Sequence, residues 1–548
     1  MAYHPSRRQL LAGAGASALA ASASALPRDA VVARGVVYED KRGAGPRRPG
    51  DRGIAGVMVS NGRDVALTGP DGAFALAVEP GDSVFVIKPA HWMTRTTAAG
   101  LPQFSYLYQP EGSPPQPGLR FPVVEPTGAL PHSIDFALMR HEEAPEFEAL
   151  LVSDTQPDSL AELSYVRDDI VAGLLGVGGA AFGINHGDVV ADDLSLYPRY
   201  LSLLGSTGFT WHHCPGNHDI NYAAPDDRHS RETWKHTFGP RSYAFQHGQA
   251  TFFILDNVEY LGRGRYRGAL GVRQLQFIRN VLTRVPREHL VVLSMHIPLV
   301  CYLEPDNPAD TTADWRALLK TLAGYGHTVS FAGHLHTTEH HYLDGEDASV
   351  GAAPHHHHVL TAACGSWWSG PSDSRGIPCA ESSDGTPNGF HVLSVAGNRY
   401  TTRFVPAAGK APAQLRLLID GPHRRARDPG ACDRLGLTVP HEALVGCRVL
   451  ANVFDGGPRT RVTLEVAGRP ERVAMAPATA PDPLVSELFA GDSPRKSWVA
   501  ATPCAHLWQA ALPAGLVPGA HVLLVRARDE YGREHTARAV LELTGPGA

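Results

Sequence analysis

The chain has 548 residues, of which 43% are hydrophobic and 19% are charged, and its formal net charge is −6 at pH 7. Because a single hydrophobic core stops growing near about 250 to 300 residues, we expect about three domains. The acidic balance provides no general positive field for a nucleic-acid backbone, so we expect no nucleic-acid partner.

The first 25 residues have the pattern of an export signal. Ser6-Arg7-Arg8-Gln9-Leu10-Leu11 is a twin-arginine pattern, a small apolar stretch follows, and Ala23-Ser24-Ala25 is an A-x-A cleavage site. An ordinary secretory signal or a membrane anchor is the alternative, but the apolar stretch is too short and too rich in Ala and Gly to span a bilayer stably. We therefore predict a twin-arginine-type signal peptide over residues 1–25 and a periplasmic or secreted product that starts at Leu26. Because no run of about 20 apolar residues follows, we expect no transmembrane anchor.

Residues 26–144 are predicted to form an all-β domain. Short apolar runs such as 57–60 and 73–78 are separated by turn dipeptides such as Asn61-Gly62, which is the pattern of hairpins in a small β-sandwich. The stretch 53–74 also loosely resembles the prealbumin-like domains that accompany many exported bacterial hydrolases.

Residues 145–408 carry apolar runs that alternate with segments of helical spacing, which predicts an α/β domain. Buried strands are expected at 149–152, 181–184, 209–211, 251–255, 290–293 and 328–331, and helices at 160–175, 194–204, 272–282 and 315–322. Ligands of such folds bind beyond the carboxyl ends of the strands, so the polar residues after each run are the candidate site residues. Residues 409–548 return to strands and Gly- and Pro-rich turns, which predicts a second, Ig-like β-sandwich.

Polar residues with metal-ligand chemistry follow five of these strands. They are Asp154, Gln156, Asp188, Asn217, His296, His334 and His336. Divalent metal ions take carboxylate and amide oxygens and imidazole nitrogens, which this set supplies. A glycine precedes Asp188, Asn217 and His334 and permits the tight turns that aim a side chain off a strand end. Each dipeptide alone is a common turn, but the ordered set predicts a metal centre.

The order D-x-x, G-D, G-N-H-D, H and G-H-x-H, over about residues 148 to 400, resembles the calcineurin-like metallophosphoesterase superfamily. The stretches 187–198 and 364–370 are similar to its exported bacterial branch, in which a β-domain lies on each side of the catalytic domain. The resemblance implies a multidomain fold in which a central α/β metallophosphoesterase sandwich of βαβαβ type is flanked by N-terminal and C-terminal β-sandwich domains.

The same resemblance implies a dinuclear metal centre. Asp154, Gln156 and His336 would hold one ion, Asn217, His296 and His334 would hold the other, and Asp188 would bridge both. The two divalent ions, whether manganese, iron or zinc, would clamp the phosphoryl oxygens and supply a metal-bound hydroxide as the nucleophile. His218 would lie beside the leaving group as a general acid or as a hydrogen-bond donor to the phosphate. Asp188 and His218 are therefore the predicted catalytic residues.

Gln156 departs from the family pattern, because most members carry His at this position. A neutral amide oxygen is a weaker ligand than imidazole for softer ions, so the first site is expected to favour Mn or Fe(II) over Zn, or to be partly occupied. Some branches of the superfamily carry Gln here, which indicates adaptation, and loss of one metal is the alternative.

Three aromatic residues are predicted to contact the substrate together with Asn217 and His218. Tyr222 follows the G-N-H-D loop, and Trp367 and Trp368 stand between a Gly-Ser and a Ser-Gly pair. Packing of one or both tryptophan rings in the core is an equally weighted alternative.

Several features stay open on the sequence alone. A polar loop near the active face is expected for the four-histidine run His355 to His358, with metal binding as the alternative. Asp192 and Asp193 either support the metal ligands or supply charge at a helix N-terminus. Seven cysteines in an oxidising compartment permit disulfides, and Cys432 with Cys447 is the one suggested pair.

The sequence thus predicts a metal-dependent hydrolase of phosphomonoesters or phosphodiesters. The alternative is an exported envelope or glycan-binding protein with a vestigial metal site, which Gln156 and the large flanking domains favour. Retention of Asp188, His218, His334 and His336 argues against that alternative. The kind of phosphate ester, the metal and the oligomeric state are left open.

Overall fold

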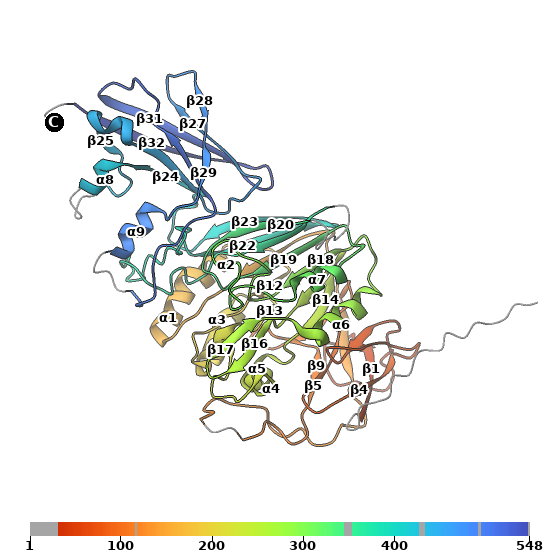
Figure 1. The fold of residues 1–548 in the computed structure, drawn as a ribbon. Coiled ribbons are helices and arrows are strands. Elements are labelled where there is room, and N and C mark those ends of the chain that lie inside the picture. Colours follow the sequence, from red (N-terminus) through yellow and green to blue (C-terminus); the bar gives the residue numbers. More distant parts are fainter. Residues whose placement is uncertain (1–30, 116–117, 345–352, 427–432, 491–494, 546–548) are drawn as a thin grey trace, which may run out of the picture.

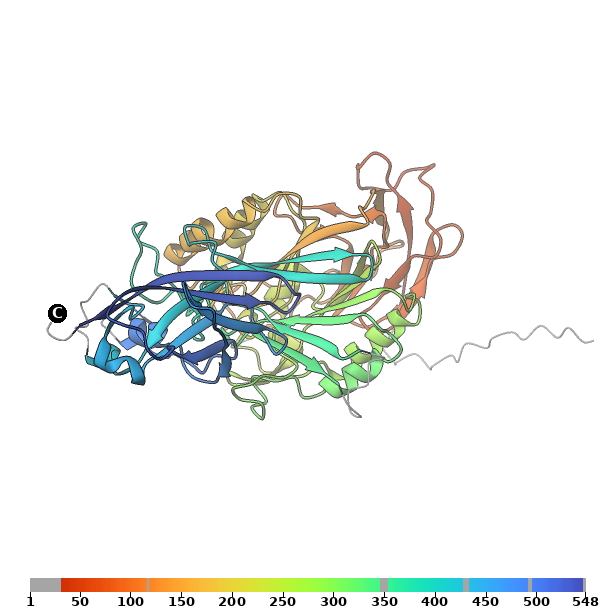
Figure 2. The ribbon, with the colours of Figure 1, turned by 90° about the horizontal axis from the view of Figure 1, so that it is seen from above.

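The structure is a computed structural model that describes residues 31–115, 118–344, 353–426, 433–490 and 495–545. A β-sandwich at each end flanks a central α/β domain, as Figures 1 and 2 show from two directions. The predicted fold class is therefore confirmed. The predicted signal peptide and Cys432 of the suggested disulfide lie outside the described residues. Within the described part, no helix is both long enough and apolar enough to cross a membrane.

The N-terminal domain consists of two four-stranded sheets with the orders β4-β1-β10-β6 and β3-β2-β5-β9. In β4, Phe74, Leu76 and Val78 are buried, while the residues between them face outwards, because successive side chains of a strand point to opposite faces. The strands are β1 (Val31–Glu39), β2 (Met58–Ser60), β3 (Val65–Leu67), β4 (Ala73–Val78), β5 (Asp82–Val86), β6 (Trp92–Met93), β9 (Ser105–Tyr108) and β10 (Phe136–Arg140), with a hairpin of β7 (Arg95–Thr96) and β8 (Pro102–Gln103).

The central domain stacks a five-stranded sheet, β13-β12-β11-β22-β23, on a six-stranded sheet, β14-β15-β18-β19-β21-β20. In the first sheet β11, β12 and β13 are parallel, and in the second β15, β18, β19 and β21 are parallel. The strands are β11 (Glu146–Val152), β12 (Phe182–Asn185), β13 (Trp211–His213), β14 (Tyr243–His247), β15 (Ala250–Ile254), β18 (Leu290–Ser294), β19 (Thr328–Ala332), β20 (Glu339–Leu343), β21 (His355–Val359), β22 (Gly389–Ala396) and β23 (Arg399–Pro406), with a hairpin of β16 (Val258–Gly262) and β17 (Arg265–Gly268).

Helices pack on the two sheets through apolar side chains. Leu163 and Ile170 pack with Val152 of the first sheet, while Phe277 and Leu318 belong to the core of the second. The helices are α1 (Leu160–Tyr165), α2 (Ala172–Leu175), α3 (Tyr197–Gly205), α4 (Asp227–Ser230), α5 (Glu232–Phe238), α6 (Gly271–Leu282) and α7 (Trp315–Thr321). A π-helical turn, Val166–Val171, joins α1 to α2, so the predicted helix over 160–175 is continuous but not uniformly α-helical.

The four-histidine run forms a buried strand, so the prediction of a polar loop there is wrong. His355 to His358 make up most of β21, which lies between β19 and β20, and all four side chains are at most 4% exposed. His355 contacts the hydroxyls of Thr328 and Ser330 at 2.8 Å. Hydrogen-bonded neutral imidazoles can take core positions, which a pattern based on apolar residues does not detect.

The C-terminal domain is a sandwich of two sheets with the orders β24-β26-β30-β29 and β25-β32-β31-β27-β28. Its core includes Leu417, Val449, Trp508 and Leu541. The elements are β24 (Leu415–Asp420), α8 (Pro422–Ala426), β25 (Thr438–Pro440), β26 (Arg448–Val453), β27 (Arg461–Val466), β28 (Arg472–Ala474), β29 (Ala476–Ala478), α9 (Pro483–Ala490), β30 (Leu507–Ala511), β31 (Gly519–Arg528) and β32 (Glu534–Thr544).

Candidate metal centre

The predicted metal ligands meet at the carboxyl ends of five strands. Loops after β11, β12 and β13 of one sheet face loops after β18 and β19 of the other. Five of the seven residues have positive φ angles, namely Asp154 (51°), Gln156 (35°), Asp188 (51°), His334 (75°) and His336 (54°). Such backbone costs about 1 to 3 kcal/mol per residue and persists where the surrounding structure enforces it, typically at functional sites.

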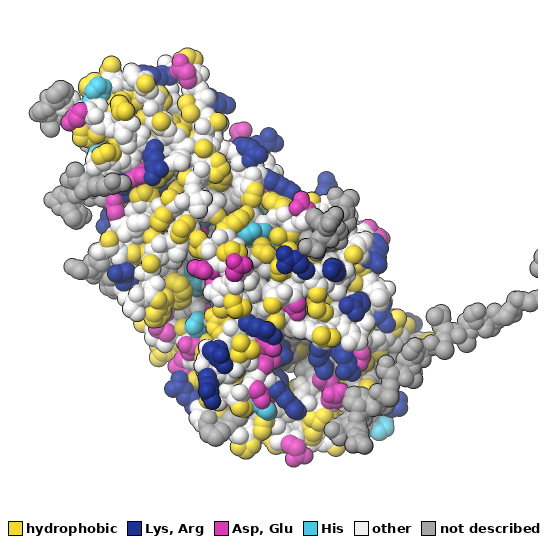
Figure 3. Space-filling view, in the orientation of Figure 1, with side chains coloured by type: hydrophobic (Ala, Val, Ile, Leu, Met, Phe, Trp, Pro, Cys, Tyr) yellow, Lys and Arg dark blue, Asp and Glu magenta, His cyan; other side chains and the backbone are white. Residues whose placement is uncertain are grey.

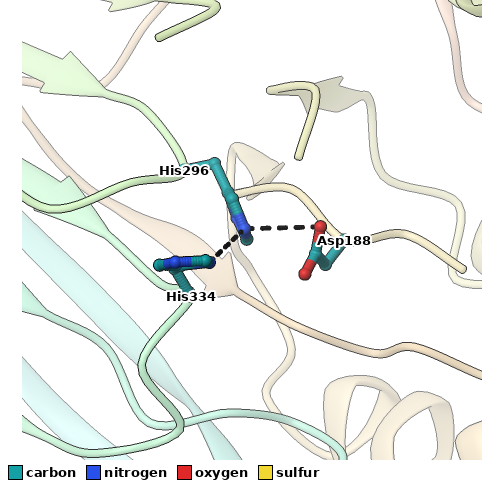
Figure 4. A group of neighbouring side chains, drawn as sticks. All are labelled: Asp188, His296 and His334. Atoms are coloured by element: carbon teal, nitrogen blue, oxygen red, sulfur yellow. Dashed lines mark hydrogen bonds and ion pairs between the residues drawn. The ribbon is translucent and has the colours of Figure 1, made fainter. Parts of the chain in front are cut away.

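Asp188, Asn217, His296 and His334 form one cluster of donor atoms. Nε2 of His296 lies 3.3 Å from Oδ1 of Asp188, 2.9 Å from Oδ1 of Asn217 and 3.2 Å from Nδ1 of His334. Figure 4 shows the His296 ring between Asp188 and His334. Nδ1 of His296 contacts the carbonyl oxygen of His186 at 2.8 Å, which orients the ring so that Nε2 faces the cluster.

Asp154, Gln156 and His336 form a second cluster, which meets the other carboxylate oxygen of Asp188. Nε2 of His336 lies 3.7 Å from Oδ1 of Asp154, and Nδ1 of His336 is hydrogen-bonded to the carbonyl of Gly365. Gln156 donates from Nε2 to Oδ2 of Asp188 at 2.8 Å. Gln156 would have to turn its amide over to present Oε1 to a cation, because the amide nitrogen is a donor only.

The charges of the site favour a cation. Burial disfavours the protonated form of His296, yet the carboxylates of Asp188 and Asp154 raise its pKa to about 9. Burial also opposes ionisation of Asp188, but His296 and His218 outweigh it and lower the pKa of this carboxyl. Buried carboxylates that stabilise a cationic imidazole would equally stabilise a divalent metal ion. The donor set, with the Nδ1 atoms of His296 and His336 held by backbone carbonyls, fits that role.

Two glycines let the ligand loops approach one another. A Cβ atom at Gly333 would lie 2.3 Å from Oδ2 of Asp154, and one at Gly216 would lie 2.1 Å from Oδ1 of Asp188. Asp219 holds the second loop in place, because its buried carboxylate accepts hydrogen bonds from the Gly216 N–H at 2.8 Å and the Tyr197 hydroxyl at 2.9 Å. The ligand positions therefore depend on the lack of a side chain at these two sites.

His218 lies at the edge of the cluster, with its side chain 30% exposed. Nδ1 of His218 is 2.7 Å from Oδ1 of Asp192, and Nε2 is 4.0 Å from Oδ2 of Asp188. Burial lowers the pKa of His218, but Asp188 and Asp192 outweigh this and raise it to about 9. Asp193 instead caps the short helix at Leu194–Leu196 by accepting from the Ser195 N–H. Asp192 thus supports His218, whereas Asp193 is a helix cap.

The two tryptophans occupy different environments. The half-buried ring of Trp367 stacks on His336 with the ring centroids 3.8 Å apart, and its centroid is 6.2 Å from that of Trp498 in the C-terminal domain. Trp368 is only 4% exposed and donates from Nε1 to the carbonyl of Thr155 at 3.0 Å. The Trp368 ring therefore packs behind the loop that carries Asp154 and Gln156, as in the core-packing alternative, while Trp367 is the more exposed of the two rings.

Tyr222 borders a cavity that is also lined by Asp192, the partner of His218. Its hydroxyl donates to the carbonyl of Asn217 at 2.8 Å and so supports the G-N-H-D loop. The cavity has a volume of about 240 Å³ and is lined by Tyr222, Asp192 and residues 118–121 of the N-terminal region. The N-terminal region thus contributes to the surroundings of the predicted substrate residues.

Two neighbours of the ligands carried no signal in the sequence. Oδ1 of Asp310, in the loop after β18, lies 3.3 Å from Nε2 of His334. Trp498, which faces Trp367, belongs to the C-terminal domain. Asp310 stands in an ordinary polar loop, and Trp498 is distant in the chain, so only the folded arrangement reveals either contact.

Two family models match the chain. Residues 148–338 match Calcineurin-like phosphoesterase, and residues 357–535 match the C terminal of Calcineurin-like phosphoesterase. The second match begins within β21 and so includes the last strands of the central domain.

The comparison with curated proteins found no match. A solved structure of a purple acid phosphatase from yellow lupin (Lupinus luteus) seeds aligns over 69% of this chain and 67% of that chain, with 10% sequence identity and a TM-score of 0.33.

Proposed function

Because the chain belongs to the calcineurin-like phosphoesterases, it is a metal-dependent phosphoric ester hydrolase, and we propose that it works with two divalent metal ions that share Asp188. The position of Asp188 carries this proposal: Oδ1 lies 3.3 Å from Nε2 of His296, and Oδ2 lies 2.8 Å from Nε2 of Gln156. One ion would be held by Asp154, Gln156 and His336, and the other by Asn217, His296 and His334.

Two ions in this position would neutralise phosphoryl oxygens and generate a nucleophile at neutral pH. The side chains of the protein position the reacting groups. The His334 N–H donates to both oxygens of Asp154, at 3.1 and 3.0 Å, and the His218 N–H donates to Oδ1 of Asp188 at 2.9 Å. These backbone bonds hold the carboxylates in fixed orientations, so little reorganisation is needed when phosphate arrives.

His218 is the proposed proton donor to the leaving group. Its Nδ1 is engaged by Asp192, so Nε2 is the ring atom left to face a substrate. The partial exposure of the side chain allows it to reach a bound ester. A positioned imidazole that donates a proton to a departing alkoxide contributes about 100-fold or more to the rate.

The organic part of the ester is proposed to occupy the cavity beside Tyr222 and Asp192, with Trp367 on the His336 side of the site. On the face of the described residues shown in Figure 3, Lys and Arg side chains lie interspersed with Asp and Glu side chains. This mixed surface fits a small phosphate ester better than a long polyanion, whose binding depends on many basic contacts.

The proposal is tested by manganese-dependent hydrolysis of p-nitrophenyl phosphate and of its bis ester. Asp188→Asn is the control for contaminating phosphatase, and metal content is measured on both proteins. We expect the variant to lose turnover and bound metal, since Asp188 contacts both clusters. Full turnover by Asp188→Asn would refute the shared-carboxylate centre. A parent protein that holds fewer than two ions per chain more than a variant with both Asp188→Asn and His296→Ala would refute the dinuclear form.

The protein is also proposed to be exported by the twin-arginine route, on the basis of Ser6 to Leu11 and the Ala23–Ala25 site. Fractionation of a bacterial host that expresses the full chain should recover a periplasmic or secreted product whose N-terminus is Leu26. Arg7→Lys with Arg8→Lys should retain the protein in the cytoplasm. Unchanged export by the double variant would contradict this route.

A further inference from the structure

A separate group of buried polar side chains lies where the central domain meets the C-terminal domain. His340 belongs to β20, His358 to β21 and His391 to β22, whereas Asp455 follows β26 of the C-terminal domain. β20 and β21 are in the six-stranded sheet and β22 is in the five-stranded sheet, so the group joins both sheets to the third domain. Figure 1 shows β20 and β22 next to the C-terminal domain.

Three imidazole nitrogens surround one carboxylate oxygen in this group. Oδ1 of Asp455 lies 3.1 Å from Nε2 of His340, 3.0 Å from Nε2 of His358 and 3.3 Å from Nε2 of His391. Four donors bound tetrahedrally to zinc, with bonds of about 2.0 to 2.1 Å, lie about 3.3 Å from one another. The three distances to Asp455 are therefore close to those between zinc ligands, and the donor atoms of His340, His358 and Asp455 all lie within 4.8 Å of one another. His391 reaches this set through its contact with Asp455.

Hydrogen bonds within this group leave one buried ring nitrogen that faces Asp455 without a partner among the described residues. Asp455 meets His340 and His391 in hydrogen-bond geometry. Nε2 of His358, however, has no hydrogen-bond partner among the described residues, although the ring is fully buried and this atom faces Asp455. A buried nitrogen without a partner is destabilising. A cation among the four side chains would accept the lone pair of this nitrogen.

The ionisation of the group suits metal binding. Burial lowers the pKa of the His358 imidazole to about 3. Burial opposes ionisation of Asp455, but the neighbouring imidazoles of His391 and His358 outweigh it and hold the pKa of this carboxyl well below its usual range. Neutral imidazole and ionised carboxylate are the forms that bind metal. Three nitrogen donors and one oxygen donor match the preference of zinc.

A further ring holds His340 in position. Nδ1 of His340 contacts Nε2 of His356 at 2.9 Å, and Nδ1 of His356 contacts the Tyr400 hydroxyl at 2.7 Å. Partners of this kind on the far nitrogen are usual for histidines that bind metal. His356 and His358 share one face of β21, because side chains two residues apart in a strand point the same way.

We propose that His340, His358, His391 and Asp455 bind one structural zinc ion that fastens the C-terminal domain to both sheets of the central domain. The three histidines are at most 1% exposed and the Asp455 side chain is 10% exposed, so the four donors form a closed site, as structural zinc sites do. The ion would also anchor β20, which begins at Glu339, just after the loop that carries His336.

The test is the zinc content of the full chain when the phosphoesterase centre cannot hold metal. A background variant with Asp188→Asn and His296→Ala removes two ligands of that centre, and it should keep about one zinc per chain after dialysis. Adding His391→Gln should lower the zinc content at least about tenfold. Adding His355→Gln, on the opposite face of β21, should leave it unchanged and controls for non-specific binding by the histidine run.

A second measurement needs no variant at the proposed zinc site. Removal of metal from the background variant should lower its Tm, stoichiometric zinc should restore it, and cobalt(II) should bind with the visible absorption of a tetrahedral ion. Folded background protein that holds no zinc and gains no stability from it would overturn the proposal. Zinc content that His391→Gln leaves unchanged would also overturn it, because the zinc would then be bound without His391 or elsewhere in the chain.

Discussion

Gly216→Ala is the sharpest test of the proposed shared carboxylate. An alanine Cβ at this position would lie 2.1 Å from Oδ1 and 2.2 Å from the backbone nitrogen of Asp188, whereas Cβ contacts under 3.0 Å essentially do not occur. Asp188 and the backbone of residue 216 must therefore move apart by at least about 0.9 Å, the difference between 3.0 and 2.1 Å. Misplacement of a catalytic group by about 1 Å can cost about 100-fold in rate, or about 2.7 kcal/mol of transition-state stabilisation.

The loss of rate should come from the steric contact and not from backbone strain. The backbone of Gly216 has φ of −102° and ψ of −177°, which any residue can adopt. The assay is kcat/KM for p-nitrophenyl phosphate with manganese, together with metal content and Tm. Gly178→Ala is the matched control, since a Cβ there meets no described atom within 4 Å. A Gly216→Ala protein that keeps its metal and a rate within about threefold of the parent protein would contradict this prediction. Asp188 would then not need its observed position for catalysis.

Three further predictions follow from other contacts. His218→Ala should keep its metal but lower kcat about 100-fold or more on an alkyl phosphate, and full rate on that poor leaving group would exclude His218 as the acid. Gln156→His should shift metal preference from manganese towards zinc in competition assays, because imidazole is the stronger ligand for zinc, and unchanged selectivity would count against Gln156 as a ligand. Burial opposes ionisation of Asp529, but hydrogen bonds from His535 and Arg533 outweigh it and hold its pKa at about 2. The stabilisation of the folded protein by the Asp529 carboxylate is therefore fully present above the pKa that Asp529 has in the unfolded chain. It is lost as the pH falls towards 2. Asp529→Asn should accordingly lower the free energy of unfolding by about 2 kcal/mol at pH 7 in urea titrations, and a difference constant from pH 7 to pH 2 would refute the linkage.

The central strands could be predicted from the sequence wherever their residues are apolar. The run 149–152 lies within β11, and 290–293 lies within β18. The pattern failed where buried strands carry histidine. Residues 209–211 were expected as a strand, but β13 is Trp211–His213, and His212 is buried with its ring stacked on Phe245. A neutral imidazole can pack as a core ring, so hydrophobic periodicity places such strands wrongly or misses them.

The predicted ligands were accessible to sequence reasoning because each one comes two to four residues after the end of a strand. Asp154 comes two residues after Val152, the end of β11, and His334 comes two residues after Ala332, the end of β19. Asp455 and Trp498 come from the C-terminal domain, and their contacts with the central domain depend on how the two domains pack. No local pattern encodes that packing, which is why the group around Asp455 emerges only from the structure.

One stretch of chain connects the two groups of side chains that we propose to bind metal. His334 and His336 have positive φ angles, and strained turns of this kind persist only where their surroundings hold them. The His334 N–H is held by Asp154, while four residues beyond His336 the ring of His340 meets Asp455 of the C-terminal domain. A zinc ion at His340 would fix the far end of this stretch. The C-terminal domain would then act on the phosphoesterase centre through the position of the loop, without supplying a catalytic ligand of its own.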